Sequence, residues 1–278
     1  MQVQFPRSLR QSDRNEGQAA MKRFAAAALR YLYSAVCSVY LFSFGVFSAK
    51  HRRVLWAICA HFGYCEVRPI IPTVKVSQVV PDDASIQMRE PIGIDGSVSP
   101  LELMVIAKMV RFFNPRTLFE IGTFDGRTTL NLAANCSPNA RVYTLDLPKE
   151  ELKRTKLTLA PGDRGFIEKD RSGSRFQGTD VHPRITQLFG DSATFDFSPF
   201  YNSVDFVFID GSHSYPYVLN DSKVVLRLLR NGKGVILWHD YAGWEGVTRA
   251  LNELFSQTKE FQGLRRIEHS SLVYLMAK

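Results

Sequence analysis

The feature that most constrains this fold is an alternation of short apolar segments with longer amphipathic ones between residues 117 and 276. Five apolar runs are continuous enough to be buried on both faces, at 117–122, 141–147, 185–189, 204–210 and 234–238. Apolar residues at helical spacing follow three of them, at 127–134, 216–230 and 245–255. Buried strands that alternate with helices are typical of a parallel sheet covered on both faces. The sequence therefore predicts an α/β, doubly wound, mostly parallel sheet.

Local signals define both ends of this pattern. Ser99, Pro100 and Glu102 form a helix start, with a capping serine, a proline at the first position and a glutamate three residues after the cap. Near the C-terminus, the apolar segments 264–268 and 271–276 predict a hairpin. With this hairpin the expected sheet has seven strands, in a domain that covers 97–278.

Residues 148–184 interrupt the alternation. This stretch is charged, contains glycine and shows little regular pattern. A loop of that length in a compact domain usually covers or forms a binding site. The alternative, a solvated surface excursion, stays open from the sequence.

Positive charge is concentrated at the N-terminus. Residues 1–68 hold ten Lys or Arg against three Asp or Glu, whereas residues 69–278 hold 25 against 24. The net charge of +8 therefore divides into +7 and +1. Because the α/β part lacks a basic excess and interleaved aromatic residues, we expect it to bind no nucleic acid.

The N-terminal segment divides into a basic tail at 1–23, expected to be flexible, and an apolar and basic helical segment at 24–68. Within it, 31–49 is a run of 19 residues without charge, close to the roughly 20 that span a bilayer as a helix. Three interpretations stay open. The segment is a membrane anchor, a pair of helices that lie on lipid or pack on protein through 24–65, or a secretory signal.

The first strand runs into a turn that suits a nucleotide cofactor. Gly122 and Gly126 allow a sharp turn, and the next helix begins at once, so that its N-terminus faces a ligand. Phe124 and Arg127 occupy positions where a dinucleotide fingerprint needs glycine, which disfavours hydride transfer. An acidic residue before the first glycine, Glu120, suits a cofactor with a positively charged amino-acid end.

Acidic residues also end the following strands. Asp146 lies 24 residues after Gly122, near the offset at which a carboxylate accepts ribose hydroxyls. Asp191 and Ser192 follow the third strand, where they can contact an adenine edge. Asp210 ends the fourth strand. Each acid alone could be a helix cap, but together they predict one binding rim.

These motifs resemble those of class I S-adenosylmethionine (SAM)-dependent methyltransferases, in the order EIGTFDGRTT, VYTLDLP, ITQLFGDSATFDF, VDFVFIDGSHSY and GVILWHDY. The group most similar is methyltransferase family 24, and EIGTFDG also resembles the first motif of caffeoyl-CoA and catechol O-methyltransferases. The resemblance covers about 97–278. The resemblance implies that the SAM pocket is lined by Glu120, Gly122, Asp125, Gly126, Thr128, Asp146, Asp191 and Ser192. We also expect Asp210 to contact the cofactor.

The chemical site is expected beside the cofactor's methyl group, where the fourth and fifth strands end. Asp210, His213, His239 and Asp240 can converge there, because neighbouring strands lie about 4.8 Å apart. A histidine of ordinary pKa can take a proton from an alcohol at neutral pH, which makes His213 the candidate base, with Asp240 as a second catalytic residue.

The resemblance extends to metal-dependent O-methyltransferases of macrolide sugars, and implies a divalent cation, Mg²⁺ or Mn²⁺, held by Asp210, His239 and Asp240. In those enzymes an acidic pair occupies the positions of residues 239 and 240. His239 departs from that pattern, and a nitrogen ligand favours a softer metal than magnesium.

The sequence therefore predicts a SAM-dependent O-methyltransferase that acts on a hydroxylated small molecule, such as a sugar or natural product. A hydroxylase-like enzyme on the same fold and a membrane-associated, non-catalytic cofactor-binding module are the alternatives. The four cysteines form no CxxC pair, which predicts reduced thiols. We expect a cytoplasmic protein, membrane-associated if the N-terminal segment binds lipid, that forms a homo-oligomer.

Overall fold

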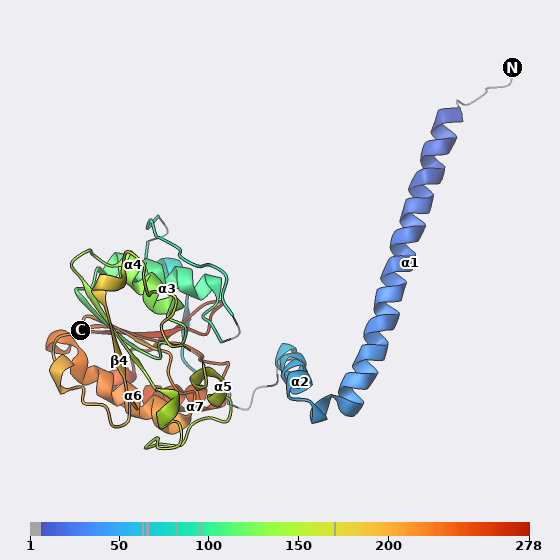
Figure 1. Cartoon of the computed structure of the whole chain (residues 1–278). Coiled ribbons are helices and arrows are strands. Elements are labelled where there is room, and N and C mark those ends of the chain that lie inside the picture. The colour runs from blue at the N-terminus through green and yellow to red at the C-terminus, as the bar shows by residue number, and fades with distance from the viewer. Residues whose placement is uncertain (1–6, 63, 65–66, 82, 95, 170) are drawn as a thin grey trace. The chain divides into compact units, whose positions relative to one another are not determined.

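The computed structural model describes residues 7–62, 64, 67–81, 83–94, 96–169 and 171–278 (Figure 1). The chain divides into two compact units, Met1–Cys65 and Glu66–Lys278. The second unit starts about 30 residues before the domain boundary expected from the sequence.

The second unit is built on one sheet of eight strands in the order β1-β7-β8-β6-β5-β2-β3-β4. The strands are β1 (Thr73–Val74), β2 (Thr117–Ile121), β3 (Arg141–Asp146), β4 (Ile185–Phe189), β5 (Phe206–Ile209), β6 (Gly234–Trp238), β7 (Arg265–Ile267) and β8 (Val273–Ala277). Among the strands of the described residues, only the pairings of β8 with β6 and with β7 are antiparallel. The doubly wound, mostly parallel α/β fold is thus confirmed.

Helices cover both faces of this sheet (Figure 1). One face packs against α3 (Pro100–Phe113) and α4 (Arg127–Asn135), and the other against α6 (Tyr215–Leu228) and α7 (Glu245–Gln257). Residues of the central strands alternate between the two cores, so that Leu118 and Phe208 face α3 and α4 while Phe119 and Val207 face α6 and α7. Burial on both faces explains why these strands read as unbroken apolar runs.

The helix start expected at Ser99 is present. The Ser99 side chain accepts from the Glu102 backbone N–H, and Glu102 accepts from the Ser99 backbone N–H in return. Shorter elements are α5 (Arg164–Ile167) and the 3-10 helices η2 (Val76–Gln78), η3 (Lys149–Glu151), η4 (His182–Arg184), η5 (Ser198–Phe200), η6 (Arg230–Gly232) and η7 (Lys259–Phe261).

The eighth strand, β1, lies in a stretch to which the sequence assigned no structure. It pairs in parallel with β7 at the sheet edge. The stretch around it is integral to the domain, because Ile71, Val79 and Val80 are buried. Side chains of α4 also hold it, since Asn135 and Asn131 accept from the backbone N–H groups of Gln87 and Arg89. A two-residue strand carries no periodicity by which sequence reasoning could find it.

The first unit consists of α1 (Arg7–Phe44), the 3-10 turn η1 (Gly45–Phe47) and α2 (Ala49–His61). Residues 7–23, expected as a flexible tail, form the first part of α1. The reason is local, since this stretch contains no proline and holds four arginines, two alanines and two glutamines, which favour helix. Residues 1–6 lie outside the described residues. Among the described cysteines, Cys37, Cys59 and Cys136 are free thiols.

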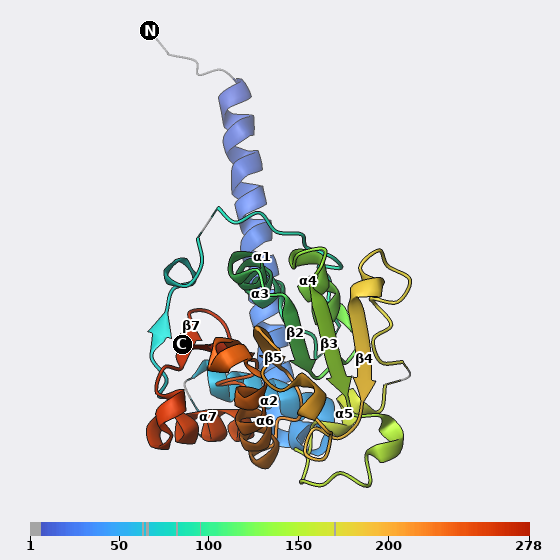
Figure 2. The ribbon, with the colours of Figure 1, turned by 90° about the vertical axis from the view of Figure 1, so that its left-hand side faces the viewer.

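The parallel arrangement brings the carboxyl ends of the strands to one edge. In Figure 2 the arrowheads of β3 and β4 point toward α5, which belongs to the 148–184 segment. The connections reverse direction between β2 and β5, which are neighbours in the sheet. Ligands of such sheets bind outside the strand ends at this switch point.

Candidate functional site

A pocket opens at the carboxyl ends of β2 to β6, at the switch point. It encloses about 980 Å³ of empty space, its open mouth included. Of the residues expected from the sequence, those that line it are Gly122, Asp146, Asp191, Ser192, Asp210, His213, His239 and Asp240. The 148–184 segment lines the opposite wall through Leu159, Asp163, Phe166, Ile167 and Lys169. It therefore forms part of the pocket wall and is not a solvated excursion.

Gly122 forms the sharp turn after β2, with a φ of +101°. A Cβ atom there would lie 1.9 Å from the backbone oxygen of Asp210, at the tip of β5. Glycine is therefore required here so that the tips of β2 and β5 can meet, whether or not a ligand also approaches this turn. It brings Asp210 directly beside the floor of the pocket.

Asp146 ends β3 with a side chain that is almost fully buried. Its Oδ2 lies 2.7 Å from the Lys169 ammonium and accepts from the hydroxyl of Ser172. Both partners come from the 148–184 segment, so the carboxylate links this segment to the sheet. Asp146 nevertheless lines the pocket, where a carboxylate can accept hydroxyl groups of a ligand.

Asp191 is fixed on both of its oxygens. Oδ1 accepts from the Tyr217 hydroxyl and the Ala193 backbone, and Oδ2 accepts from the Lys156 backbone at 2.7 Å. The carboxylate therefore shapes the pocket wall by holding α6 and the 148–184 segment. Ser192, which also lines the pocket, remains next to it at the rim.

Glu120 does not line the pocket. It is fully buried on β2, where its Oε2 accepts from the hydroxyls of Thr129 and Thr144. Burial raises the pKa of Glu120 to about 8, although the two threonine hydrogen bonds act in the opposite direction. At neutral pH the side chain is therefore mostly an uncharged acid, which does not fit the expected contact with a positively charged cofactor end.

Three further residues expected at the cofactor lie beside the pocket without lining it. Asp125 pairs with the Arg175 guanidinium at 2.6 Å and caps the Arg127 backbone. Gly126, with a φ of +87°, has no room for a Cβ beneath the 148–184 segment, because one would lie 2.7 Å from the Phe176 ring. Thr128 is buried in the first turn of α4. These residues support the turn and the covering segment.

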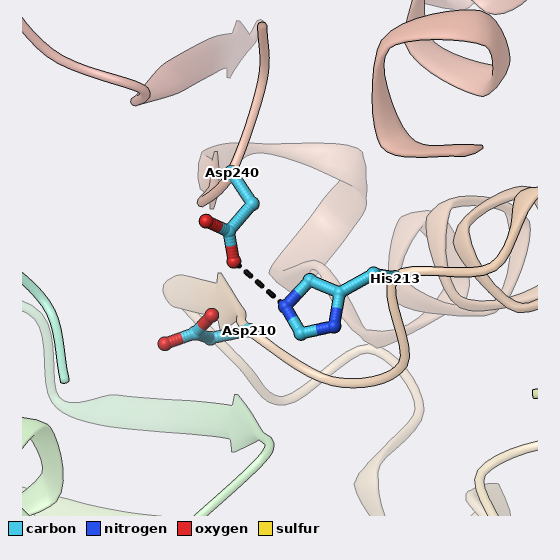
Figure 3. Close-up of side chains that lie close together, drawn as sticks. All are labelled: Asp210, His213 and Asp240. Carbon is cyan, nitrogen blue, oxygen red and sulfur yellow. Dashed lines mark hydrogen bonds and ion pairs between the residues drawn. The ribbon is translucent and has the colours of Figure 1, made fainter. Parts of the chain in front are cut away.

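His213 lies between two carboxylates. Its Nδ1 is 2.5 Å from Oδ1 of Asp163, and its Nε2 is 2.9 Å from Oδ2 of Asp240. Figure 3 shows the His213 ring pointing toward Asp240, with Asp210 beside them. The indole of Trp244 stacks on the imidazole, with ring centroids 4.0 Å apart and planes at 15°. These contacts fix both the position and the plane of the ring.

The two carboxylates change the expected acidity of His213. Burial alone lowers the pKa of the imidazole, but the hydrogen bonds and charges of Asp163 and Asp240 outweigh it and raise the pKa to about 9. The same contacts hold the pKa of the Asp163 and Asp240 carboxyls below the ordinary value, against the effect of burial. The structure thus corrects the expectation of a histidine with an ordinary pKa.

His239 lies at the centre of three carboxylates. Its Nε2 lies 3.3 Å from Oε2 of Glu102, and its Nδ1 lies 3.1 Å from Asp210 and 3.0 Å from Asp240. Burial lowers the pKa of His239, yet the neighbouring carboxylates raise it well above the ordinary value. Although Nδ1 is buried and close to both aspartates, neither of them is oriented to complete a hydrogen bond with it.

This donor set fits a divalent cation. One oxygen or nitrogen each from Asp210, His213 and Asp240 lie within 4.8 Å of one another, and His239 Nδ1 faces the two aspartates without a hydrogen bond. Four carboxylates, Glu102 and Asp163 included, surround two imidazoles, so that the cluster has excess negative charge. Carboxylate and imidazole together suit a first-row transition metal such as manganese or iron.

The backbone at Asp240 supports a specialised role. Its φ is +67°, in the left-handed region that non-glycine residues seldom adopt, and Ala242 follows at +69°. Such conformations cluster where a site requires them. The turn directs the Asp240 carboxylate back toward His213 and His239.

The sequence did not indicate two carboxylates of this site. Asp163 lies in the 148–184 segment, whose irregular pattern gave no reason to choose one acid. Glu102 was recognised only as part of a capping box, yet its Oε1 also accepts from the backbone and hydroxyl of Ser271, at 2.7 Å each. The one signal that could have indicated Glu102 is that this acid of a helix cap does not lie on an exposed face of its helix.

Comparisons with known proteins give one family match. Residues 119–241 match a family model described as a methyltransferase domain. A search of curated proteins finds no significant match.

Several solved structures are similar to this chain, all at low identity. An O-methyltransferase from Bacillus cereus in complex with SAH is 19% identical, covers 66% of this chain and 84% of its own, and has a TM-score of 0.47. The SAM-bound O-methyltransferase TomG from Streptomyces achromogenes, involved in tomaymycin synthesis, is 19% identical, with coverages of 80% and 96% and a TM-score of 0.45. An SAH-bound methyltransferase of Podospora anserina is 14% identical, with coverages of 83% and 97% and a TM-score of 0.48.

The family match spans the segment that carries the site. It begins on β2 and ends one residue after Asp240, so it includes every strand tip that forms the pocket. Residues 119–241 of this chain therefore match a methyltransferase-domain family, in agreement with the resemblance to methyltransferase family 24.

Proposed function

We propose that this chain is a SAM-dependent O-methyltransferase that acts on a hydroxylated small molecule. The observation that carries the proposal is the position of His213. Its imidazole lines the same pocket as Asp146 and Asp191, and is oriented by Asp163 and Trp244. A proton acceptor is thus placed within one enclosed space with the residues suited to an adenosyl cofactor.

The cofactor end of the pocket has carboxylates suited to an adenosine. Asp146 ends the strand next to the glycine turn, where a carboxylate accepts ribose hydroxyls in folds of this kind. Ser192 lies at the rim of the next strand, with its neighbour Asp191 held rigid by Tyr217. The apolar side chains of Leu147 and Ile167 add surface for a flat base between these polar groups.

When bound, SAM supplies a methyl group whose bond to sulfur breaks, with the electron pair left on sulfur, as the acceptor oxygen forms its bond to carbon. The contribution of the chain is to remove the hydroxyl proton and to align the acceptor. His213 takes the proton on Nε2, while Asp163 holds the proton on Nδ1 and keeps the ring in that tautomer. Asp240 accepts from Nε2–H once the imidazolium has formed.

The raised pKa of His213 limits this step at neutral pH. With a pKa of about 9, roughly one molecule in a hundred carries the neutral imidazole at pH 7. We propose that Asp210, Asp240 and His239 hold a divalent cation, Mn²⁺ in preference to Mg²⁺. Such a cation would offset the carboxylate charge that keeps the proton on His213 and would lower the pKa of a bound hydroxyl.

Calorimetric titration with SAM, followed by mass spectrometry of an extract incubated with labelled SAM, tests the function. We expect SAM to bind the wild-type chain and His213→Ala alike, while His213→Ala lowers the rate of transfer by about 10²- to 10⁴-fold. His182→Ala, at an exposed histidine of η4, is the matched control. Full activity in His213→Ala would exclude the base assignment, and a chain that binds no SAM would exclude the function.

Product mass separates this reaction from other chemistry on the same fold. Methylation adds a CH₂ unit to the acceptor, whereas hydroxylation adds an oxygen atom. Treatment with EDTA and return of Mn²⁺ or Mg²⁺ tests the cation independently. We expect activity to fall on chelation and to return more fully with Mn²⁺, because the site includes imidazole nitrogen.

A further inference from the structure

Helix α1 exposes a largely uncovered apolar surface between Met21 and Phe44. Its large apolar side chains there are between 52% and 81% exposed, as at Tyr31, Leu32, Val36, Val39, Tyr40 and Phe42, except for the half-buried Leu41. The helical segment Met21–Phe47 is long and apolar enough to cross a membrane, and none of its apolar window is buried. Exposed apolar surface of this extent marks an interaction with a partner or a membrane.

The distribution of these side chains indicates how lipid would meet the helix. Tyr31, Leu32 and Tyr33 are consecutive and all exposed, and successive residues of a helix point about 100° apart. The apolar surface therefore surrounds the helix and is not confined to one face. A helix that lies flat on a membrane needs a strongly charged face, and residues 31–49 contain no charge.

The length of the uncharged run is close to that of a bilayer. Its first 14 residues, 31–44, belong to α1 and extend about 21 Å at 1.5 Å per residue, and the 3-10 turn at 45–47 adds about 6 Å at about 2.0 Å per residue, against about 30 Å of hydrocarbon. Within the run, the Ser38 hydroxyl donates to the Ser34 carbonyl, so this polar group is satisfied inside the helix. Internal satisfaction of polar groups is what the hydrocarbon requires.

Both ends of the run carry the groups expected at the membrane surface. Lys22, Arg23 and Arg30 precede it, and at the other end the Arg52 guanidinium donates to the Val46 carbonyl, 2.9 Å away. This contact satisfies a backbone carbonyl just beyond the helix C-terminus with a cation. In α2 and just beyond it, Trp56 and Tyr64 lie with ring centroids 5.8 Å apart and are about half exposed. Tryptophan, tyrosine and basic residues are enriched at this level of a bilayer.

We propose that α1 and the η1 turn that follows it span a lipid bilayer with residues 31–47 in the hydrocarbon, and that Arg30 and Arg52 lie at its two surfaces. The chain is then a membrane-anchored protein whose α/β unit is tethered beside the lipid. This inference depends on the N-terminal unit alone and stands or falls separately from the methyl transfer.

The test is flotation of the full chain, synthesised in a cell-free system with preformed vesicles of pure phosphatidylcholine. We expect the wild-type chain to float with the vesicles after washing at high salt and alkaline pH. We expect Val36→Arg combined with Val39→Arg to abolish flotation, because it places two charges mid-span. Both side chains are exposed, so no internal packing is lost.

Phe24→Arg combined with Ala27→Arg is the matched control, since it adds the same charge to exposed positions of the same helix outside the run. We expect this variant to float like the wild-type chain. Three results would overturn the proposal: release of the wild-type chain by the wash, equal loss of flotation in both variants, or sedimentation without lipid. In cells, removal of the N-terminal segment, seen by intact mass, would identify a secretory signal and would equally overturn it.

Discussion

Glu120→Gln tests whether the acid at the end of the first glycine motif is a buried neutral group or a charged cofactor ligand. The side chain is fully buried, its Oε2 accepts from Thr129 and Thr144, and its Oε1 has no partner among the described residues. Glutamine preserves the shape and can accept from the same hydroxyls. It removes only the ability to ionise, at the cost of an additional unpaired hydrogen.

The direction of the pH dependence of stability follows from the raised pKa of Glu120. Below pH 4.5 both the native and the unfolded chain carry the Glu120 proton, and its contribution to stability is fully present. As the pH rises toward about 8 the unfolded chain releases the proton while the native chain holds it, so stability is lost over this interval. At 1.36 kcal/mol per pKa unit, the interval corresponds to about 5 kcal/mol.

Urea denaturation of both full-length chains between pH 4 and pH 9 measures this difference through the fluorescence of Trp238 and Trp244. We expect the free energy of unfolding of Glu120→Gln, relative to wild type, to rise by about 5 kcal/mol across the range. We also expect the variant to bind SAM normally at pH 7. A stability difference that does not change with pH would refute the raised pKa, and lost SAM binding in a folded variant would restore Glu120 as a charged ligand.

Two further predictions concern His213 and the glycine turn. In the metal-free chain, NMR of labelled histidine should show His213 titrating near pH 9, and Asp163→Asn should move this titration to lower pH because one of the two raising carboxylates is lost; an unchanged titration would contradict the assignment. Gly122→Ala should lower stability by at least about 3 kcal/mol in thermal unfolding, because its Cβ would overlap the Asp210 carbonyl. Gly165→Ala, whose Cβ would meet nothing within 4 Å, is the control and should be nearly neutral.

The sequence predicted the features that local pattern determines. Strand β6 occupies the residues expected, because a buried parallel strand is an unbroken apolar run with turns at both ends. The convergence of Asp210, His213, His239 and Asp240 was also predictable, since parallel strands bring their carboxyl ends to one edge. The fold class and the family were therefore evident from residues that are close in sequence.

The features that were missed depend on contacts between distant residues. Asp163 becomes part of the site only because the 148–184 segment folds back over β5, and Glu102 reaches His239 from a helix cap 137 residues earlier. Glu120 was expected at the cofactor because its position suggested a ligand, whereas the structure buries it on β2 and does not place it among the residues that line the pocket. The homo-oligomeric state and the cytoplasmic location stay predictions.

The position of Asp163 couples one wall of the pocket to the imidazole. This carboxylate, which orients His213, belongs to the 148–184 segment that walls the pocket. A displacement of that segment would therefore also remove the partner of the imidazole. In the proposed transfer, acceptance of the proton by His213 would depend on this segment being in place.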